Sequence, residues 1–335
     1  MTRFIYLFPM IPFLRPLTSL ATLSLCLSSL LSAADLRIGL IGLDTSHATA
    51  FTEILNDPKS KEYVPGARVV AAFQGGSADI ETSISRVEGY TKTLKEKYGV
   101  KIVETIAELC REVDAVMLLS VDGRPHLAQA RPVIAARKPL YIDKPMAGSL
   151  RDVLELARLA KEAKVPLFSS SSLRFSKANA AIHSGSIGTV TTAWCGSPAK
   201  TEKTHPDLFW YGIHGCESLF AVMGEGCLSA QRQKTATGTI ETVGRWKEGR
   251  TGIFREIEGY GGSASGTIGT AAAGTFDGYA PLVTQVIHFF QSGLVPVPIE
   301  ETIELFAFME ADNESRIRQG AEVTLKEVLL RATRP

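Results

Sequence analysis

The chain has 335 residues, and 36 lysines and arginines against 35 aspartates and glutamates give it a formal net charge of +1. Charged residues make up 21% of the sequence and form no basic block, which argues against a nucleic acid as the partner. The length allows two domains of ordinary size, each with its own hydrophobic core.

Residues 1–34 predict a signal segment. Two arginines precede an apolar run over 17–31, and small residues follow this run up to Ala34. We therefore expect cleavage after Ala34, export to the periplasm or the extracellular space, and no stable membrane insertion of the mature chain. Two alternatives stay open: the segment remains as an uncleaved membrane anchor, or Cys26 carries a lipid.

The cysteines of the mature chain show neither a Cys-x-x-Cys pair nor the cysteine and histidine spacing of a zinc site. One disulfide could form in an oxidising compartment, but the simpler expectation is that all four are buried, small hydrophobic side chains. We expect no bound metal. The four are Cys110, Cys195, Cys216 and Cys227.

Residues 35–165 predict a domain with a parallel sheet. Short apolar strands alternate with amphipathic helices from Arg37 to about Val165, which is typical of βαβ units. We expect strands at 37–42, 68–74, 114–120 and 139–142, and helices that end at Asp57, span 87–98 and begin at the capping box Ser149-x-x-Asp152.

Residues 166–335 predict a second domain of the α+β class. Beyond Pro166 the segments are longer, alternate between apolar and polar residues and contain glycines, which indicates a mostly antiparallel open sheet. The predicted fold class is therefore α/β, with a Rossmann-type sheet first and an α+β domain after it. We expect strands at 189–195, 238–246, 251–258 and 265–276, and a last helix from about Glu300.

The first strand ends in a loop where a dinucleotide fingerprint would lie. Gly42 supplies the first glycine of that fingerprint, while Asp44 and His47 stand in place of the second and third. Asp44 is either a cofactor-binding residue or the N-cap of the following helix. Thr45, Ser46 and His47 can donate hydrogen bonds to phosphate oxygens, so we expect this loop to bind the cofactor.

The ends of the second and third strands predict further contacts. In NAD-binding domains the second strand usually delivers an acid to the adenosine ribose, but here it delivers Gln74, so the choice between NAD and NADP stays open. A plain glycine turn after Gln74 is the alternative. Ser120 ends the third strand on the cofactor side. His126 begins the next helix, where it either faces substrate or takes part in helix capping.

Asp143-Lys144-Pro145 follows an apolar strand and places a lysine at the strand's carboxyl end. Ligands of open parallel sheets gather at that edge, and a lysine there can donate to a substrate oxygen or help to move a proton. We expect Asp143 and Lys144 to contact the cofactor and Lys144 to act in catalysis. Farther on, Arg174 follows four serines and either binds substrate or forms a structural ion pair.

His214 and Glu217 have the spacing of neighbours on one face of a helix. An imidazole with a carboxylate partner is the arrangement of a positioned general base, although such a pair is also common as a structural hydrogen bond. Trp210 and Tyr211 precede them, and aromatic faces suit the apolar faces of sugar rings. The segment therefore predicts a substrate site.

Taken together, these motifs resemble those of the Gfo/Idh/MocA oxidoreductases, from about Arg37 to the end of the chain. The resemblance implies a Rossmann domain with NAD or NADP, and a second domain whose open sheet forms the contact of a homo-oligomer. Its anchors are Gly39-x-x-Gly42, the strand at 114–116 followed by His126, Asp143-Lys144-Pro145 in place of Glu-Lys-Pro, Arg174-Phe175, residues 185–190 and the segment around His214.

By this resemblance, Lys144 is the catalytic lysine, His214 the base and Glu217 the acid beside it. Trp210 stands where many members have aspartate, which marks a divergent branch. We expect an NAD- or NADP-dependent oxidoreductase that acts on a sugar, polyol or related hydroxyl compound. The alternatives are an enzyme that cleaves glycosides through transient oxidation with a retained cofactor, and a binding protein that has lost the chemistry.

Overall fold

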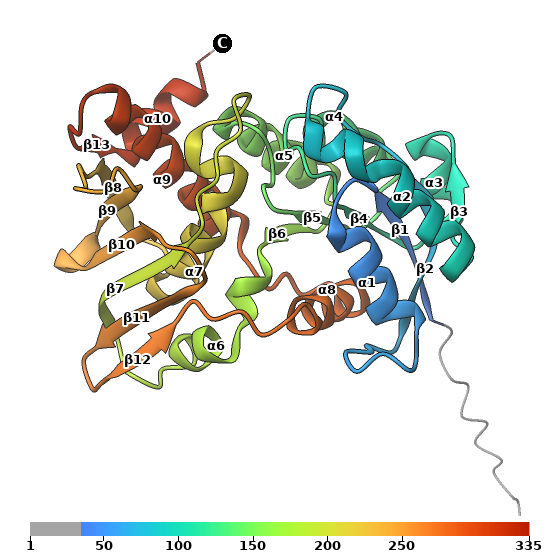
Figure 1. The fold of residues 1–335 in the computed structure, drawn as a ribbon, viewed down its shortest axis with the longest axis horizontal. Helices are drawn as coiled ribbons and strands as arrows, with labels where there is room; N and C mark the ends of the chain where they lie inside the picture. The colour runs from blue at the N-terminus through green and yellow to red at the C-terminus, as the bar shows by residue number, and fades with distance from the viewer. Residues whose placement is uncertain (1–34, 335) are drawn as a thin grey trace, which may run out of the picture. The chain divides into compact units, whose positions relative to one another are not determined.

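The computed structural model describes residues 35–334, and the predicted signal segment or anchor lies outside this range. Within it, two sheets with their own helices form the first and second domains (Figure 1). No helix in the described part of the chain is both long and apolar enough to cross a membrane.

The first domain has six strands in the order β3-β2-β1-β4-β5-β6, and all neighbours are parallel. This is the strand order of a Rossmann fold, which confirms the predicted fold class. Strands β4 and β5 are buried along their whole length, as expected for a sheet covered on both faces. The strands are β1 (Leu36–Ile41), β2 (Ala67–Phe73), β3 (Lys101–Val103), β4 (Ala115–Leu118), β5 (Leu140–Asp143) and β6 (Leu167–Ser170).

Five helices connect these strands and cover the sheet (Figure 1). Helix α5 begins at the predicted capping box, where the Ser149 hydroxyl accepts a hydrogen bond from the Asp152 amide. Helix α1 is capped by Thr45 and not by Asp44, because the Thr45 hydroxyl accepts from the His47 amide. The helices are α1 (Ser46–Asn56), α2 (Glu81–Tyr98), α3 (Ile106–Glu112), α4 (His126–Ala135) and α5 (Leu150–Ala163).

The second domain has seven strands in the order β12-β11-β7-β10-β9-β8-β13. Only β7 and β10 are parallel, so the predicted mostly antiparallel sheet is confirmed. The single strand predicted at 265–276 is wrong, because a hairpin turn divides the segment. The strands are β7 (Val190–Ser197), β8 (Cys227–Arg232), β9 (Glu241–Trp246), β10 (Thr251–Glu256), β11 (Gly261–Gly266), β12 (Thr270–Ala273) and β13 (Val323–Thr324).

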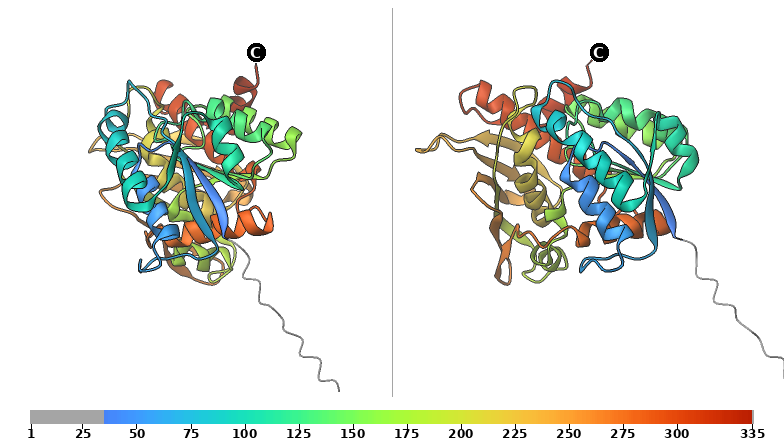
Figure 2. Two further views of the ribbon diagram at one scale, coloured as in Figure 1. Left: turned by 90° about the vertical axis from the view of Figure 1, so that its right-hand side faces the viewer. Right: turned by 45° about the vertical axis from the view of Figure 1, so that its right-hand side comes forward.

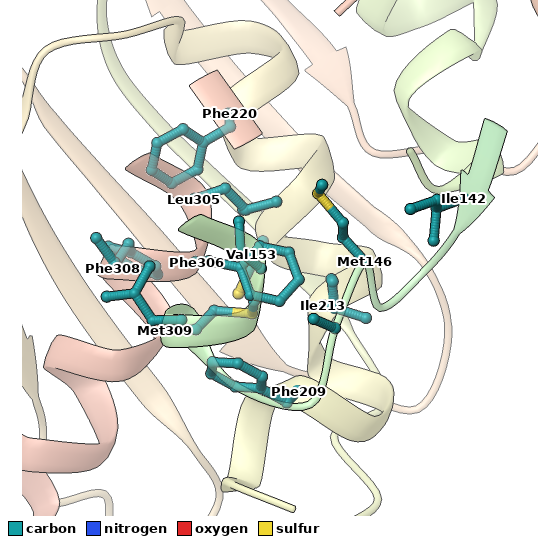
Figure 3. Packing of buried hydrophobic residues seen from close by; sticks show 14 of the residues in the cluster. Ile142, Met146, Val153, Phe209, Ile213, Phe220, Leu305, Phe306, Phe308 and Met309 are labelled. Atoms are coloured by element: carbon teal, nitrogen blue, oxygen red, sulfur yellow. The ribbon is translucent and has the colours of Figure 1, made fainter. Parts of the chain in front are cut away.

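Helices α7 and α9 pack on one face of this sheet, and α9 also contacts α5 of the first domain (Figure 2). Phe220 of α7 and Phe308 of α9 belong to one buried hydrophobic cluster, which also includes Ile142 and Val153 of the first domain (Figure 3). The other helical segments are η1 (Ser172–Phe175), α6 (Lys177–His183), the π-helical turn η2 (Leu208–Gly212), α7 (Ile213–Met223), η3 (Lys247–Gly249), α8 (Ala280–Ser292), α9 (Ile299–Ile317) and α10 (Leu325–Ala332).

The boundary predicted between residues 165 and 166 does not separate the two sheets. Strand β6 lies beyond it and pairs with β5. Helix α8 also returns to the first domain, where Phe289 meets Phe168 in a core that includes Phe51 of α1. The chain therefore crosses between the domains more than once, because apolar residues of α8 complete the core of the first sheet.

Candidate active site

A pocket of about 420 Å³ lies where the carboxyl ends of the parallel strands meet the start of α7. Ligands of doubly wound sheets bind at this edge. Three cations, Arg86, Lys144 and Lys200, line the pocket, and no carboxylate is among the described lining residues. The remaining lining residues are Thr45, Ser46, His47, Thr82, Val121, Ser172, Leu173, Trp210, Tyr211, His214, Tyr260, Phe276 and Tyr279.

A larger hollow of about 810 Å³ lies in the second domain between β8, α9 and α10. Its lining includes Leu228, Glu304 and Leu330 but no histidine and none of the residues predicted for the site. We therefore place the candidate active site in the smaller pocket, where Lys144 and His214 meet.

His47, which lines the pocket, forms a buried pair with Asp143 behind it. His47 Nδ1 lies 2.5 Å from Asp143 Oδ2, and the Tyr141 hydroxyl donates to Asp143 Oδ1 at 3.1 Å. Burial raises the pKa of Asp143, but the charge and hydrogen bond of His47, together with Lys144, outweigh it and hold this pKa at about 2. The carboxylate is therefore ionised at neutral pH, and it faces Nδ1 of His47.

His214 lines the pocket from the second domain. Its Nδ1 lies 2.7 Å from the Ser171 hydroxyl, and its ring makes edge contacts with the rings of Tyr211 and Tyr260. Burial, followed by the nearby charges of Lys144 and His47, lowers the pKa of His214 well below its ordinary value. His214 is therefore neutral at physiological pH.

The predicted orientation of His214 by Glu217 is wrong. Glu217 is buried and accepts from Arg174 Nε at 2.5 Å and from the Ser170 hydroxyl at 3.2 Å. Arg174 also pairs with Glu301 at 2.6 Å, so the substrate-binding role predicted for it is wrong as well, and its structural alternative holds. The reason is physical: a buried guanidinium must be paired, and it takes the carboxylate within reach.

The loop after β1 follows the predicted fingerprint only at Gly42. The φ angle of Gly42 is +88°, and a Cβ there would lie 2.3 Å from the backbone nitrogen of Ser120, so only glycine fits. Asp44 is fully buried and accepts from the Ser83 hydroxyl at 2.7 Å and from the Val121 amide at 3.0 Å. Asp44 thus ties the loops after β1 and β4 to α2 and does not line the pocket.

A second polar network joins the loops after β2 and β4. Asp122 accepts from the Ser77 hydroxyl at 2.7 Å and from Arg124, which also pairs with Asp79. His205 Nε2 of the second domain lies 3.1 Å from Asp122. Burial opposes ionisation of Asp122, but the nearby His205 imidazole and the hydrogen bonds from Arg124 hold its pKa far below the ordinary value. This network spans the side of the crevice where an adenosine would lie.

Three further predicted residues lie outside the pocket lining. The Ser120 hydroxyl donates to Gln129, and Gln74 lies at the end of β2. His126 is fully buried, with Nε2 2.9 Å from the Ser120 carbonyl and Nδ1 3.2 Å from the Met146 carbonyl. The substrate-binding role predicted for His126 is therefore wrong, because both ring nitrogens face backbone oxygens.

The two aromatic residues predicted to bind substrate lie at this pocket. Trp210 and Tyr211 line the pocket, the Trp210 ring packs on His205, and the Tyr211 hydroxyl lies 3.0 Å from that of Tyr260. Tyr260 and Tyr279 were not predicted, since nothing in the local sequence marks them. Burial raises the pKa of both phenols, so they are neutral donors at physiological pH.

No group of three potential ligands among residues 35–334 is arranged to hold a metal ion. The four cysteines of this range are buried and form no disulfide with one another.

Residues 36–171 match the model of the Gfo/Idh/MocA family, which is described as an oxidoreductase family with an NAD-binding Rossmann fold. The chain carries a Gfo/Idh/MocA Rossmann domain. The predicted family resemblance is thereby confirmed, and the predicted nicotinamide cofactor agrees with a family that binds NAD. Comparison with curated proteins gives no match.

Solved structures show a likeness in fold that covers both domains of this chain. A probable dehydrogenase from Thermotoga maritima has a TM-score of 0.68 and 22% identity, covering 88% of this chain and 100% of its own. Myo-inositol dehydrogenase from Lactobacillus casei, solved with NAD(H) and myo-inositol, has a TM-score of 0.68 and 14% identity, covering 87% and 97%. Scyllo-inositol dehydrogenase from the same organism has a TM-score of 0.67 and 14% identity, covering 87% and 98%. At these identities the likeness establishes the fold.

The residues of the pocket fit one end of a dinucleotide. The N-terminus of α1, the hydroxyls of Thr45 and Ser46 and the guanidinium of Arg86 are groups that bind phosphate, and Lys144 lies in the same pocket. At the other end, Asp79 and Asp122 are tied to Arg124. The pocket therefore offers hydrogen-bond donors for a diphosphate and a nicotinamide. Where the adenosine of such a cofactor would lie, the charged side chains form ion pairs with one another.

Proposed function

We propose that this chain is an NAD- or NADP-dependent oxidoreductase that acts on a hydroxyl-bearing carbon of a sugar, polyol or related compound. One observation carries the proposal: Lys144 of the first domain and His214 of the second line a single pocket beside the N-terminus of α1. Polar donors, an ammonium group and aromatic faces in one enclosed site suit a ligand rich in hydroxyls.

Each group in the pocket has a defined task in such a reaction. Thr45, Ser46 and Arg86 hold the diphosphate of the cofactor, whose nicotinamide supplies the hydride acceptor. The ammonium group of Lys144 donates to the substrate oxygen and stabilises the negative charge that develops there. His214, neutral and held by Ser171, offers Nε2 to a substrate hydroxyl.

Titration calorimetry with NAD and NADP, followed by a screen of inositols, aldoses and alditols for reduction of the nicotinamide, tests this proposal. We expect one dinucleotide to bind and one class of polyol to reduce it. If a folded preparation binds neither dinucleotide, the redox function is excluded and a carbohydrate-binding protein remains.

A second candidate function is the cleavage of a glycoside through transient oxidation. It is favoured by the presence of two imidazoles, His47 and His214, in one pocket, because elimination needs a base and an acid. Release of a sugar leaving group without net reduction of the cofactor distinguishes this reaction from simple dehydrogenation.

We also propose that the protein is exported and forms a homo-oligomer. The N-terminal sequence supports export, and the outer face of the second sheet supports association, because Trp194 there is only partly buried, with Arg255 over its ring. Mass analysis of the N-terminus in protein from cell fractions tests the first statement. Light scattering of the purified protein, with Trp194→Glu as the comparison, tests the second.

A further inference from the structure

His47 lies at the beginning of α1 and is fixed from three sides. Its ring stacks on Phe51 with 5.0 Å between the ring centroids and meets the edge of Tyr279 at 4.8 Å. Its Nδ1 faces Asp143, and the side chain is only 7% exposed, yet it lines the pocket. A ring held in this way has one orientation, and Nε2 is the nitrogen that remains for a ligand.

Asp143 determines which tautomer His47 adopts. Its Oδ1 accepts from the Tyr141 hydroxyl, so Oδ2 is left for His47 Nδ1. Because this carboxylate is ionised at neutral pH, it favours the proton on Nδ1 and leaves Nε2 with a free electron pair. A carboxylate in this position also stabilises the imidazolium that forms when Nε2 takes a proton.

His214 has the opposite surroundings. Its Nδ1 faces a neutral hydroxyl, and His214 forms no ion pair with a carboxylate among the described residues. The charges of Lys144 and His47 disfavour protonation of His214, whereas the charge of Asp143 favours it. Protonation of His214 would add a buried cation beside Lys144, whereas protonation of His47 completes an ion pair with Asp143.

We propose that His47, oriented by Asp143, exchanges the substrate's hydroxyl proton, and that His214 acts as a neutral hydrogen-bonding group. This inference rests on the proposed oxidoreductase function. In the oxidation, the O–H bond of the substrate breaks and its proton passes to His47 Nε2. The C–H bond breaks with its electron pair, which leaves as hydride to the nicotinamide, and the carbonyl double bond forms. Reduction runs the same steps backwards.

Two measurements test the proposal, and the first does not depend on turnover. The ring nitrogens of the six histidines are observed by ¹⁵N NMR in protein purified after expression of the full chain, and are assigned with His47→Asn and His214→Asn. We expect the neutral ring of His47 to carry its proton on Nδ1, facing Asp143, and we expect Asp143→Asn to weaken this preference. A His47 ring that carries its proton on Nε2 overturns the proposal, whether or not a substrate is known.

The second measurement is the pH profile of kcat/KM for oxidation of a polyol. We expect His47→Asn to lower kcat/KM by about 10²-fold or more and to remove the acidic limb of the profile. His214→Asn should lower the rate but keep that limb. If His47→Asn keeps the acidic limb and His214→Asn loses it, His214 is the group that takes the substrate proton, and the proposal is contradicted. Absence of turnover and dinucleotide binding in the unmodified protein contradicts the oxidoreductase function instead.

Discussion

The two ends of the crevice above the parallel sheet differ in how their polar groups are satisfied. At the nicotinamide end, Arg86, Lys144 and Lys200 line a pocket and form no ion pair with other described residues. At the adenosine end, Arg124 is paired with both Asp79 and Asp122. The comparison shows that a Rossmann sheet can leave charged side chains free to bind a ligand at one end. At the other end, the protein's own side chains already pair with one another.

This difference has an energetic consequence. A ligand that binds beside Lys144 meets cations whose hydrogen-bonding capacity is not taken up by carboxylates, so its anionic or hydroxyl groups gain new partners. A ligand at the adenosine end must compete with bonds that the protein already makes. Binding energy should therefore concentrate at the nicotinamide end, and variants at the two ends should act differently.

The largest effect is expected from Lys144→Ala. If chemistry takes place at the nicotinamide end, loss of the ammonium group should lower kcat/KM by at least about 10²-fold, because the negative charge that develops on the substrate oxygen is then no longer stabilised by Lys144. Steady-state kinetics on a polyol measures this. Lys161→Ala, on an exposed part of α5, is the matched control and should leave the rate unchanged. Equal activity of both variants would contradict the assignment of the site.

Gly42→Ala tests the close approach between the loop after β1 and Ser120 after β4. The new Cβ would lie 2.3 Å from the Ser120 nitrogen at a φ of +88°, so we expect a loss of about 2–4 kcal/mol in the free energy of unfolding. Gly99→Ala is the control, because its φ of +66° is also positive but nothing lies within 4 Å of the added Cβ. That variant should lose only about 1 kcal/mol. Urea unfolding curves compare the two, and equal losses would show that the close approach to Ser120 does not matter.

The Asp143 carboxylate makes the stability of the nicotinamide end dependent on pH. Its folded pKa of about 2 lies below the ordinary value of 3.8, so its contribution is present above pH 4 and is lost as the pH falls through 2. The shift corresponds to about 2 kcal/mol. We expect the difference in unfolding free energy between the unmodified protein and Asp143→Asn to narrow between pH 5 and pH 2. A difference that stays constant over this range would contradict the ion pair with His47.

Local sequence patterns predicted several strands of the sheet that carries this site. Strands β1, β2 and β5 lie within about one residue of their predicted positions, because short apolar segments between turn residues are a strong local signal. The hairpin of β11 and β12 was missed, since the predicted strand at 265–276 ignored the break at Gly266–Gly269, where the backbone turns and rejoins itself. Helix α8 was missed as well, although its apolar face completes the first core.

The hydrogen-bond partners of the site residues could not be predicted from local sequence patterns. His214 and Glu217 have helical spacing. Their hydrogen-bond partners, Ser171 for His214 and Arg174 for Glu217, each lie 43 positions away in the sequence. His47 and Asp143 are 96 positions apart, and only the parallel order of β1, β4 and β5 brings them together. Sequence spacing can place residues on one element, whereas hydrogen bonding across elements follows from the fold.

The smallest effect, and the most discriminating one, is expected from Asp79→Asn at the adenosine end. Asp79 is largely exposed, so its ion pair with Arg124 is weak and its loss should not unfold the protein. If this pair competes with adenosine, its removal should raise the affinity for NAD a few-fold and leave the affinity for nicotinamide mononucleotide unchanged, as measured by calorimetry. Glu53→Gln, which breaks the exposed pair with Lys97, is the control. A fall in NAD affinity would instead mean that Asp79 binds the ribose, because a carboxylate that holds the adenosine end would then be lost with the ion pair.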